Sequence, residues 1–373
     1  MKIAILTLPL HTNYGGLLQA HALQKVLTQK GHQAIVLNID RKKLVSPTKQ
    51  LLNSFKKALY KILPGKTYTP SAKEQIQNEY HVIGKYTQSF IERNITTLHY
   101  DSLRKIKKHN FDAIIVGSDQ IWRPQYYPVE AAFLDFAQGW NIRRIAYAPS
   151  FGADTWEFTP QQTQVCSHLI KLFHAVSVRE SSGVTLCNQH LNYPHATHVA
   201  DPTMLLHKED YEQLIAHLPK LDGDNLIFTY ILDACEEKTQ IVSQLCQDYN
   251  MSVHNTANPN VEKKELPFEQ RIQPPLEEWL RGFRDAKLIV TDSFHACVFS
   301  ILFNKPFVAL GNAYRGLGRI KSLLATYNLE HRLVLDTSQL SSDLLTPLAP
   351  EVQTTLNEWR KKSETFLDKA LQP

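Results

Sequence analysis

Three consecutive stretches near the start of the chain decide the fold: Lys2-Ile3-Ala4-Ile5-Leu6-Thr7, then Asn13-Tyr14-Gly15-Gly16 with the helical segment 17–30, then Ala34-Ile35-Val36-Leu37-Asn38. The first and last stretches are short apolar runs typical of strands. Between them, Leu17, Ala20, Leu23 and Leu27 keep helical spacing, and Gly31 supplies a stop. A strand, a helix and a strand within about 40 residues predict a βαβ unit with parallel strands.

The same pattern continues along the 373 residues. Further strands are predicted at 112–116, 144–148 and 175–179, and, after Asp201-Pro202-Thr203, at 226–232, 251–254, 287–291 and 307–310. A chain of this length favours two domains. We therefore predict two facing Rossmann-like α/β domains with parallel sheets, over 1–205 and 206–345. A last helix within 346–373 is expected to pack back toward the N-terminal domain.

The composition is that of a soluble globular protein, with 43% apolar and 21% charged residues. No apolar run reaches the roughly 18 residues that span a bilayer. The apolar start to Leu10 is too short for a signal peptide and lacks a cleavage site, which predicts a cytoplasmic protein. The five cysteines are scattered and show no C-x-x-C spacing, so neither a disulfide framework nor a zinc site is expected.

Charge is distributed unevenly along the chain. Residues 1–110 carry 18 Lys and Arg against 5 Asp and Glu, whereas the whole chain has a net charge of only +5. We expect a basic, mainly helical insertion over about 41–110. Within it, 51–63 forms an amphipathic basic helix, which is either an ordinary surface helix or a peripheral contact with the inner face of an anionic membrane.

The candidate site follows from the predicted parallel sheets. Ligands bind beyond the carboxyl ends of parallel strands, so the loops 13–16, 117–119, 150–152 and 179–182 are expected at one common edge. Arg179 is suited to a carboxylate or phosphate because its fork binds both oxygens. His295 and Ser293 stand at the start of an apolar helix, where anions bind favourably.

Five sequence blocks in this order resemble the polysaccharide pyruvyl transferase family. They are Asn13-Tyr14-Gly15-Gly16-x-x-Gln19-Ala20, Val116-Gly117-Ser118-Asp119-Gln120-Ile121-Trp122, Ser177-Val178-Arg179-Glu180, Ala200-Asp201-Pro202-Thr203, and Thr291-Asp292-Ser293-Phe294-His295 with Asn304-Lys305-Pro306-Phe307 downstream. The paired domains likewise resemble the GT-B type of glycosyltransferase architecture. The resemblance implies transfer of the pyruvyl group of phosphoenolpyruvate onto two hydroxyls of a sugar, forming a cyclic ketal. The sugar would belong to a cell-surface polysaccharide, such as a capsule or exopolysaccharide, or to its lipid-linked precursor.

This resemblance implies roles for individual residues. His295 would be the general acid, with Asp119 as the base or as a hydrogen-bond acceptor. The implied donor-binding residues are Arg179, Ser293, Lys305 and Arg319, and the acceptor-binding residues are Tyr14, Gly15, Gly16 and Trp122. No metal or cofactor is expected besides phosphoenolpyruvate as co-substrate. Each residue also has a structural alternative: a helix cap for Asp119 and His295, an ion pair for Arg179, and core packing for the aromatic rings.

The chain departs from part of the family, because some members have arginine where this sequence has Ser293. Two further classes therefore stay open: a nucleotide-sugar glycosyltransferase and a non-catalytic glycan-binding relative. Nucleotide-sugar enzymes usually hold the ribose with a carboxylate after the phosphate loop, and no Asp or Glu stands between Ser293 and Leu329. No recognised nucleic-acid-binding module is present.

Overall fold

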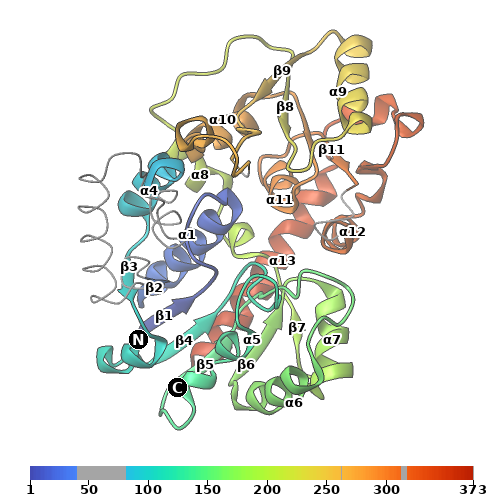
Figure 1. The fold of residues 1–373 in the computed structure, drawn as a ribbon. Coiled ribbons are helices and arrows are strands. Elements are labelled where there is room, and N and C mark those ends of the chain that lie inside the picture. Colours follow the sequence, from blue (N-terminus) through green and yellow to red (C-terminus); the bar gives the residue numbers. More distant parts are fainter. Residues whose placement is uncertain (40–80, 262, 312–316, 373) are drawn as a thin grey trace, which may run out of the picture.

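The computed structural model describes residues 1–39, 81–261, 263–311 and 317–372. Two parallel sheets divide this part of the chain into two α/β domains that face each other (Figure 1). This arrangement confirms the predicted fold class. The basic helix expected at 51–63 lies outside the described residues.

The N-terminal sheet has seven strands in the order β3-β2-β1-β4-β5-β6-β7, all parallel. They are β1 (Lys2–Leu6), β2 (Gln33–Ile39), β3 (Thr97–Tyr100), β4 (Ala113–Val116), β5 (Arg143–Ala146), β6 (Ala175–Val178) and β7 (Thr197–His198). The strand order reverses between β1 and β4. In open parallel sheets the ligand crevice forms at such a reversal, beyond the carboxyl ends of the two strands.

Helices cover both faces of this sheet, so its strands are apolar on both sides. Ile3 and Ile5 of β1 pack in one core with α1 (Tyr14–Gln29), while Ala4 and Leu6 pack in the core on the other face. The other helices of this half are α4 (Lys85–Asn94), α5 (Val129–Ala132), α6 (Pro160–Leu169) and α7 (Ser181–Leu191).

The C-terminal sheet has five strands in the order β12-β11-β10-β8-β9. They are β8 (Leu226–Tyr230), β9 (Ser252–Asn255), β10 (Leu288–Thr291), β11 (Phe307–Leu310) and β12 (Leu333–Val334). Its helices are α8 (Lys208–Leu214), α9 (Glu236–Tyr249), α10 (Leu276–Asp285), α11 (Phe294–Leu302) and α12 (Leu317–Thr326). Here the strand order reverses between β10 and β8. A second ligand crevice is therefore expected beyond the carboxyl ends of these two strands, facing the first.

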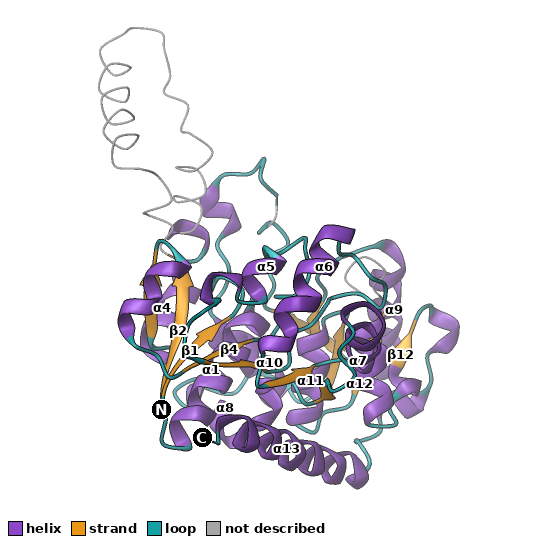
Figure 2. Ribbon diagram, turned by 90° about the horizontal axis from the view of Figure 1, so that it is seen from below, coloured by secondary structure: helices purple, strands orange, loops and turns teal. Residues whose placement is uncertain are grey.

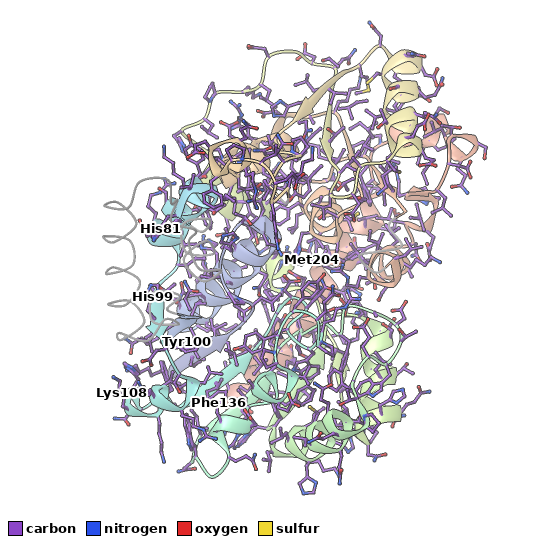
Figure 3. All side chains as sticks on the ribbon, in the orientation of Figure 1. His81, His99, Tyr100, Lys108, Phe136 and Met204 are labelled. Carbon is purple, nitrogen blue, oxygen red and sulfur yellow. The ribbon has the colours of Figure 1, made fainter. Side chains whose placement is uncertain are left out.

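The last helix, α13 (Pro350–Leu371), runs along both domains (Figure 2). Its Arg360 donates from Nε to the carbonyl of Met204 at 2.9 Å and from Nη2 to the carbonyl of Leu206 at 3.1 Å. Figure 3 shows Met204 at the junction of the two domains. Farther along the helix, Ser363 Oγ accepts the amide of Ala200 at 2.9 Å. The helix therefore holds the segment that links the two sheets.

A single apolar core joins the domains beside α1. Side chains of α1, α10 and α11 belong to this core, including Leu17, Trp279 and Phe299. Tyr14 donates its hydroxyl to the carbonyl of Pro274 at 2.6 Å, and Arg93 pairs with Glu277 at 2.6 Å. The two halves therefore share buried surface in addition to the linking segment.

The predicted helical insertion is wrong for part of its described length. Thr97–Tyr100 forms β3, which pairs with β2 at the edge of the sheet (Figure 3). Its side chains are half-buried or exposed, so the segment lacks the apolar run that marks the inner strands. Within the described residues, no helix combines the length and apolar character that a bilayer-spanning segment needs.

Candidate active site between the two sheets

A cavity of about 530 Å³ lies between the domains, at the carboxyl ends of both sets of strands. On the N-terminal side its walls include Asn13 and Gly15, which follow β1, and Asp119, which follows β4. On the C-terminal side they include the segments after β8, β9 and β10, the last of which carries His295. The two crevices predicted by the strand orders thus form one space.

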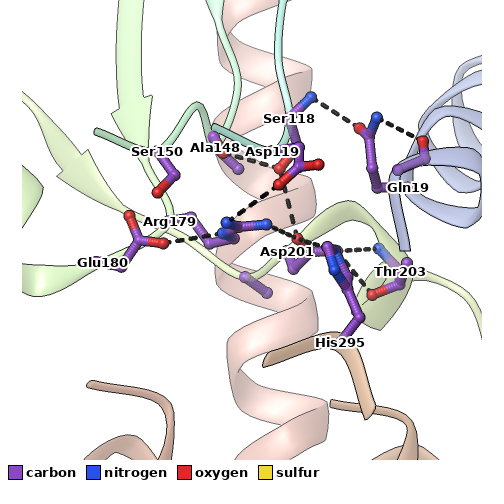
Figure 4. A network of polar contacts seen from close by, with 12 residues as sticks. Gln19, Ser118, Asp119, Ala148, Ser150, Arg179, Glu180, Asp201, Thr203 and His295 are labelled. Atoms are coloured by element: carbon purple, nitrogen blue, oxygen red, sulfur yellow. Dashed lines mark hydrogen bonds and ion pairs between the residues drawn. The ribbon is translucent and has the colours of Figure 1, made fainter. Parts of the chain in front are cut away.

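His295 enters this cavity from the first turn of α11. Its side chain is almost buried, and Nε2 lies 3.5 Å from Oδ2 of Asp201 (Figure 4). Asp201 follows β7 in the N-terminal domain, whereas His295 belongs to the C-terminal domain. A carboxylate in this position orients an imidazole.

Gly15 leaves room for the imidazole on its other side. A Cβ built on Gly15 would lie 2.0 Å from Nδ1 of His295, far inside van der Waals contact. The family resemblance implied that Gly15 binds the acceptor. The structure shows that the absence of a side chain at Gly15 also lets the ring lie against the first turn of α1.

Asp201 is the central acceptor of a buried polar network. Besides His295, it accepts from Thr203 through the amide at 3.0 Å and Oγ1 at 2.7 Å, and from Arg179 Nη1 at 2.9 Å. Burial alone raises the pKa of the Asp201 carboxyl. The hydrogen bond and charge of His295 and the charge of Arg179 outweigh burial and hold that pKa well below its ordinary value. Asp201 is therefore an anion next to the imidazole.

Arg179 is enclosed by carboxylates. Its Nε binds Glu180 at 3.0 Å, Nη1 binds Asp201, and Nη2 lies 3.6 Å from Asp119. Burial lowers the pKa of its guanidinium, but these three charges together raise it above the usual value. The guanidinium carbon also lies 4.3 Å from the ring centre of Phe294, and Arg179 is not among the residues that line the main cavity. The structure thus places Arg179 in the ion-pair network behind the cavity wall.

Arg319, at the start of α12, does line the cavity. Burial, and then the neighbouring charge of Arg179, lower the pKa of its guanidinium to about 10. An anion beside Arg319 would offset that repulsion. Of the predicted donor-binding arginines, Arg319 is the one that faces the cavity.

Asp119 lines the cavity on the N-terminal side and has a left-handed backbone, with φ of 63°. Asn13 donates from Nδ2 to Asp119 Oδ2 at 3.3 Å, and the Asn13 Oδ1 atom accepts the amide of Gly16 at 3.1 Å. Asn13 therefore caps α1 and orients Asp119 at the same time. The predicted position of Asp119 at the site agrees with this geometry.

Ser293 lines the cavity at the N-cap position of α11, but its side chain makes no capping hydrogen bond. The preceding residue, Asp292, binds elsewhere. Its Oδ1 accepts the amide of Leu232 at 2.7 Å, and its Oδ2 binds Lys238 Nζ at 2.7 Å. Asp292 thereby fixes the loop that leads from β8 into α9.

Besides Arg179, four predicted site residues do not line the main cavity: Tyr14, Gly16, Trp122 and Lys305. Gly16 lines a smaller hollow beside it. Trp122 is fully buried and stacks on Phe133 with ring centres 4.5 Å apart, and Tyr14 is fully buried between the domains. Lys305 precedes β11 and therefore lies at the amino ends of the strands, where its Nζ donates to the carbonyl of Ala286 at 2.8 Å. These placements correct the acceptor-binding predictions for Tyr14 and Trp122 and the donor-binding prediction for Lys305.

Sequence reasoning assigned no role to Asn13, Gln19 or Asp201. Gln19 lies in α1, where Oε1 accepts the amide of Ser118 at 2.8 Å and Nε2 donates to Thr7 Oγ1 at 2.8 Å (Figure 4). The sequence could have indicated a role for Gln19, because it is a polar residue on an otherwise apolar face of the helix. Among the described residues, no group of three or more His, Cys, Asp or Glu side chains is arranged to hold a metal ion.

Comparison with solved structures supports the two-domain fold. A glycosyltransferase from Rickettsia africae has 11% sequence identity and a TM-score of 0.50, over 100% of this chain and 99% of that chain. MurG from Acinetobacter baumannii has 12% identity and a TM-score of 0.44, over 99% and 94% of the two chains. At these identities the first likeness shows the fold alone, and the second lies too low to carry an argument. No curated protein matches the chain.

The family model for polysaccharide pyruvyl transferase matches residues 13–314. That range begins at the Asn13 cap and includes Asp119, Asp201 and His295. The match covers most of both sheets and both walls of the cavity. The chain therefore belongs to the polysaccharide pyruvyl transferase family.

Proposed function

We propose that the protein transfers the pyruvyl group of phosphoenolpyruvate onto two hydroxyls of a sugar in a cell-surface polysaccharide or its lipid-linked precursor. One observation carries the proposal beyond the family: His295, which lines the cavity, lies 3.5 Å from the buried, anionic Asp201 of the other domain. A buried acid beside an anion is suited to proton transfer to an enol ether carbon.

The proposed reaction balances through acid–base steps. A proton adds to the methylene carbon of phosphoenolpyruvate, and the carbon that bears phosphate becomes an oxocarbenium-like centre. Two C–O bonds form to the sugar oxygens, and the bond to phosphate breaks. Of the two hydroxyl protons released, one replaces the proton given to the methyl group and the other leaves on phosphate. No electron acceptor is needed, and the proposal includes no metal or redox cofactor.

His295 is the proposed acid. Its Nε2 lies 3.5 Å from Asp201 Oδ2, and its Nδ1 side packs against Gly15, so the ring is oriented from both domains. The resulting pair follows the logic of an aspartate that fixes a histidine tautomer.

Arg319 and the start of α11 are the proposed binding groups for the phosphate and carboxylate of the donor. Both belong to the C-terminal side of the cavity. The first amides of a helix and its dipole favour an anion, and Ser293 contributes a hydroxyl there. In this proposal Arg319 supplies the positive charge that some relatives place at the position of Ser293.

Asp119 is the proposed base for an acceptor hydroxyl. It lies on the opposite wall from α11, and its Oδ2 already accepts the Asn13 amide. The second oxygen, Oδ1, is 3.6 Å from Arg179. A carboxylate oriented from two sides is suited to receive a proton from a sugar oxygen placed between the walls.

The direct test measures phosphate release from phosphoenolpyruvate with a panel of sugar acceptors, and detects the ketal methyl group by NMR. We expect His295→Gln to keep the melting temperature and to lower the rate at least 100-fold, as expected for loss of a general acid. The matched control is His217→Gln, because His217 is an exposed histidine of the same domain. Normal turnover by His295→Gln would remove His295 as the acid.

A thermal-shift comparison separates this function from nucleotide-sugar glycosyl transfer. Phosphoenolpyruvate should raise the melting temperature of the wild type, and UDP-glucose should not. The opposite pattern would favour a glycosyltransferase, and a shift without any turnover would favour a non-catalytic relative.

A further inference from the structure

A second hollow adjoins the main cavity. It has a volume of about 280 Å³ and shares four of its wall residues with the main cavity: Leu8, Asn13, Asp119 and Tyr126. Pockets of about 300–1,000 Å³ enclose drug-sized ligands, so the main cavity accommodates phosphoenolpyruvate with one sugar ring. The second hollow adds volume on the order of one further ring.

The walls of the second hollow are neutral or acidic. Besides the four shared residues they comprise Pro9, Leu10, His11 and Gly16, with no lysine or arginine among them. Such a wall offers hydrogen bonds to hydroxyl groups through Asn13 and Asp119. The described wall residues include none of the lysines or arginines that commonly bind a diphosphate or a lipid phosphate. The chemistry therefore favours a neutral glycan.

Tyr126 forms the shared boundary of the two spaces. Its side chain is 43% exposed, although large apolar rings are usually buried. Its phenol also lies close enough to Arg319 to raise the pKa of that guanidinium. The π face of an aromatic ring is partially negative and attracts the positively polarised C–H groups on one face of a pyranose. Tyr126 thus has the chemistry and the position of a sugar-stacking residue.

The tyrosine ring is held in place by its surroundings. The guanidinium carbon of Arg123 lies 5.6 Å from its ring centre, and Arg123 binds both carboxylate oxygens of Glu157 at 2.9 Å. Gly152 has φ of +78°, and a Cβ there would come within 2.5 Å of Arg123 Cδ. A ring fixed before the ligand arrives loses little conformational entropy on binding.

We infer that Tyr126 is the platform for a second sugar ring, so that the acceptor is a neutral glycan of at least two residues. The ring that reacts lies in the main cavity, and its neighbour lies in the second hollow against Tyr126. The order of the two rings rests on the proposed function. The presence of a two-ring glycan site does not.

Binding without phosphoenolpyruvate tests this inference separately from catalysis. The wild type is applied to an array of neutral oligosaccharides and their component monosaccharides, and the best pair is measured by calorimetry. We expect the oligosaccharide to bind at least tenfold more tightly than its monosaccharide. Tyr126→Ala should abolish that difference, and Tyr126→Phe should retain it.

Tyr86→Ala is the matched control. Tyr86 is 40% exposed and also lies under a cation, with Lys85 Nζ 5.3 Å from its ring centre, but it lines neither space. Its replacement should leave glycan binding unchanged. Equal affinity for one and two rings, full binding by Tyr126→Ala, or no glycan bound on the array would overturn the inference. Failure of phosphate release with intact glycan binding would instead contradict only the proposed reaction.

Discussion

The two sides of the cleft use their charges differently. On the N-terminal side, Arg179 is surrounded by Glu180, Asp201 and Asp119, and these groups satisfy one another. On the C-terminal side, His295 and Arg319 line the cavity itself. The comparison teaches that the buried network positions the strand-end loops, whereas the basic side chains that line the cavity come from the opposite domain.

Breaking the network should have the largest effect. Arg179→Met leaves three buried carboxylates without their shared cation, and we expect the free energy of unfolding to fall by about 3–5 kcal/mol. Urea denaturation at pH 7.5 measures it. If this variant does not fold, Arg179→Lys should fold with a smaller loss.

The control for the network is an exposed pair. Lys105→Met removes a cation that binds Asp101 at 2.8 Å with 64% of the lysine side chain exposed, and it should cost less than about 1 kcal/mol. A loss of this size in Arg179→Met would contradict the positioning role of the network.

Gly15→Ala should have the next largest effect, on rate instead of stability. The new methyl group would occupy the place of His295 Nδ1, so the ring must move. A displacement of about 1 Å can lower a rate on the order of 100-fold. Phosphate release measures the change, and an unchanged melting temperature shows that the fold is kept. A rate similar to that of the wild type would mean that the contact does not position the imidazole.

Arg319→Gln tests whether Arg319 binds the anionic groups of the proposed donor. We expect the KM for phosphoenolpyruvate to rise about tenfold, with a smaller change in kcat, because a charge-assisted contact to the ground state is lost. Stability should not fall, since a buried cation next to Arg179 is removed. Lys321→Gln, on the exposed face of the same helix, is the control. An unchanged KM would show that groups other than Arg319 bind the donor.

The smallest effect concerns acid stability on the N-terminal side. Burial lowers the pKa of His198 to about 4, and its Nε2 lies 3.0 Å from the carbonyl of Arg179. An unfolded histidine has a pKa near 6.5. Between about pH 6.5 and 4 the unfolded chain therefore binds more protons than the folded chain, and the free energy of unfolding falls as the pH is lowered. We expect His198→Gln to flatten this slope by roughly 1–3 kcal/mol over the window.

Urea denaturation at several pH values measures the slope. Protonation of Asp201 belongs to lower pH, because its folded pKa is depressed below the ordinary value near 3.9. A slope that His198→Gln leaves unchanged would show that another group titrates in this window.

The sequence predicted the inner strands well because each is an apolar run bounded by turns. It missed β3, whose half-exposed side chains resemble those of a loop, and the two-residue strands β7 and β12. Helix α1 begins three residues earlier than the periodicity indicated, because Asn13 caps it. Edge strands depend on partners that are distant in the sequence, as β3 depends on β2, whereas the Asn13 cap is a local signal that the apolar periodicity does not include.

The rule that ligands meet the carboxyl ends of parallel strands correctly brought Asp119, Gly15 and His295 to one cavity. Applied consistently, the same rule would have excluded Lys305, which precedes its strand. Trp122 is buried and Tyr126 is exposed, although they stand only four positions apart, so aromatic identity alone could not separate them. That distinction depends on which face of the turn packs on the core.

The pairing of His295 with Asp201 links domain position to chemical readiness. The imidazole belongs to one domain, and its carboxylate partner and the glycine against which it lies belong to the other. Any movement that widens the gap between the domains separates the imidazole from the carboxylate beside it. In the proposed reaction, proton transfer therefore requires the two domains to be closed, which would limit hydrolysis of the enol phosphate while the cleft is open.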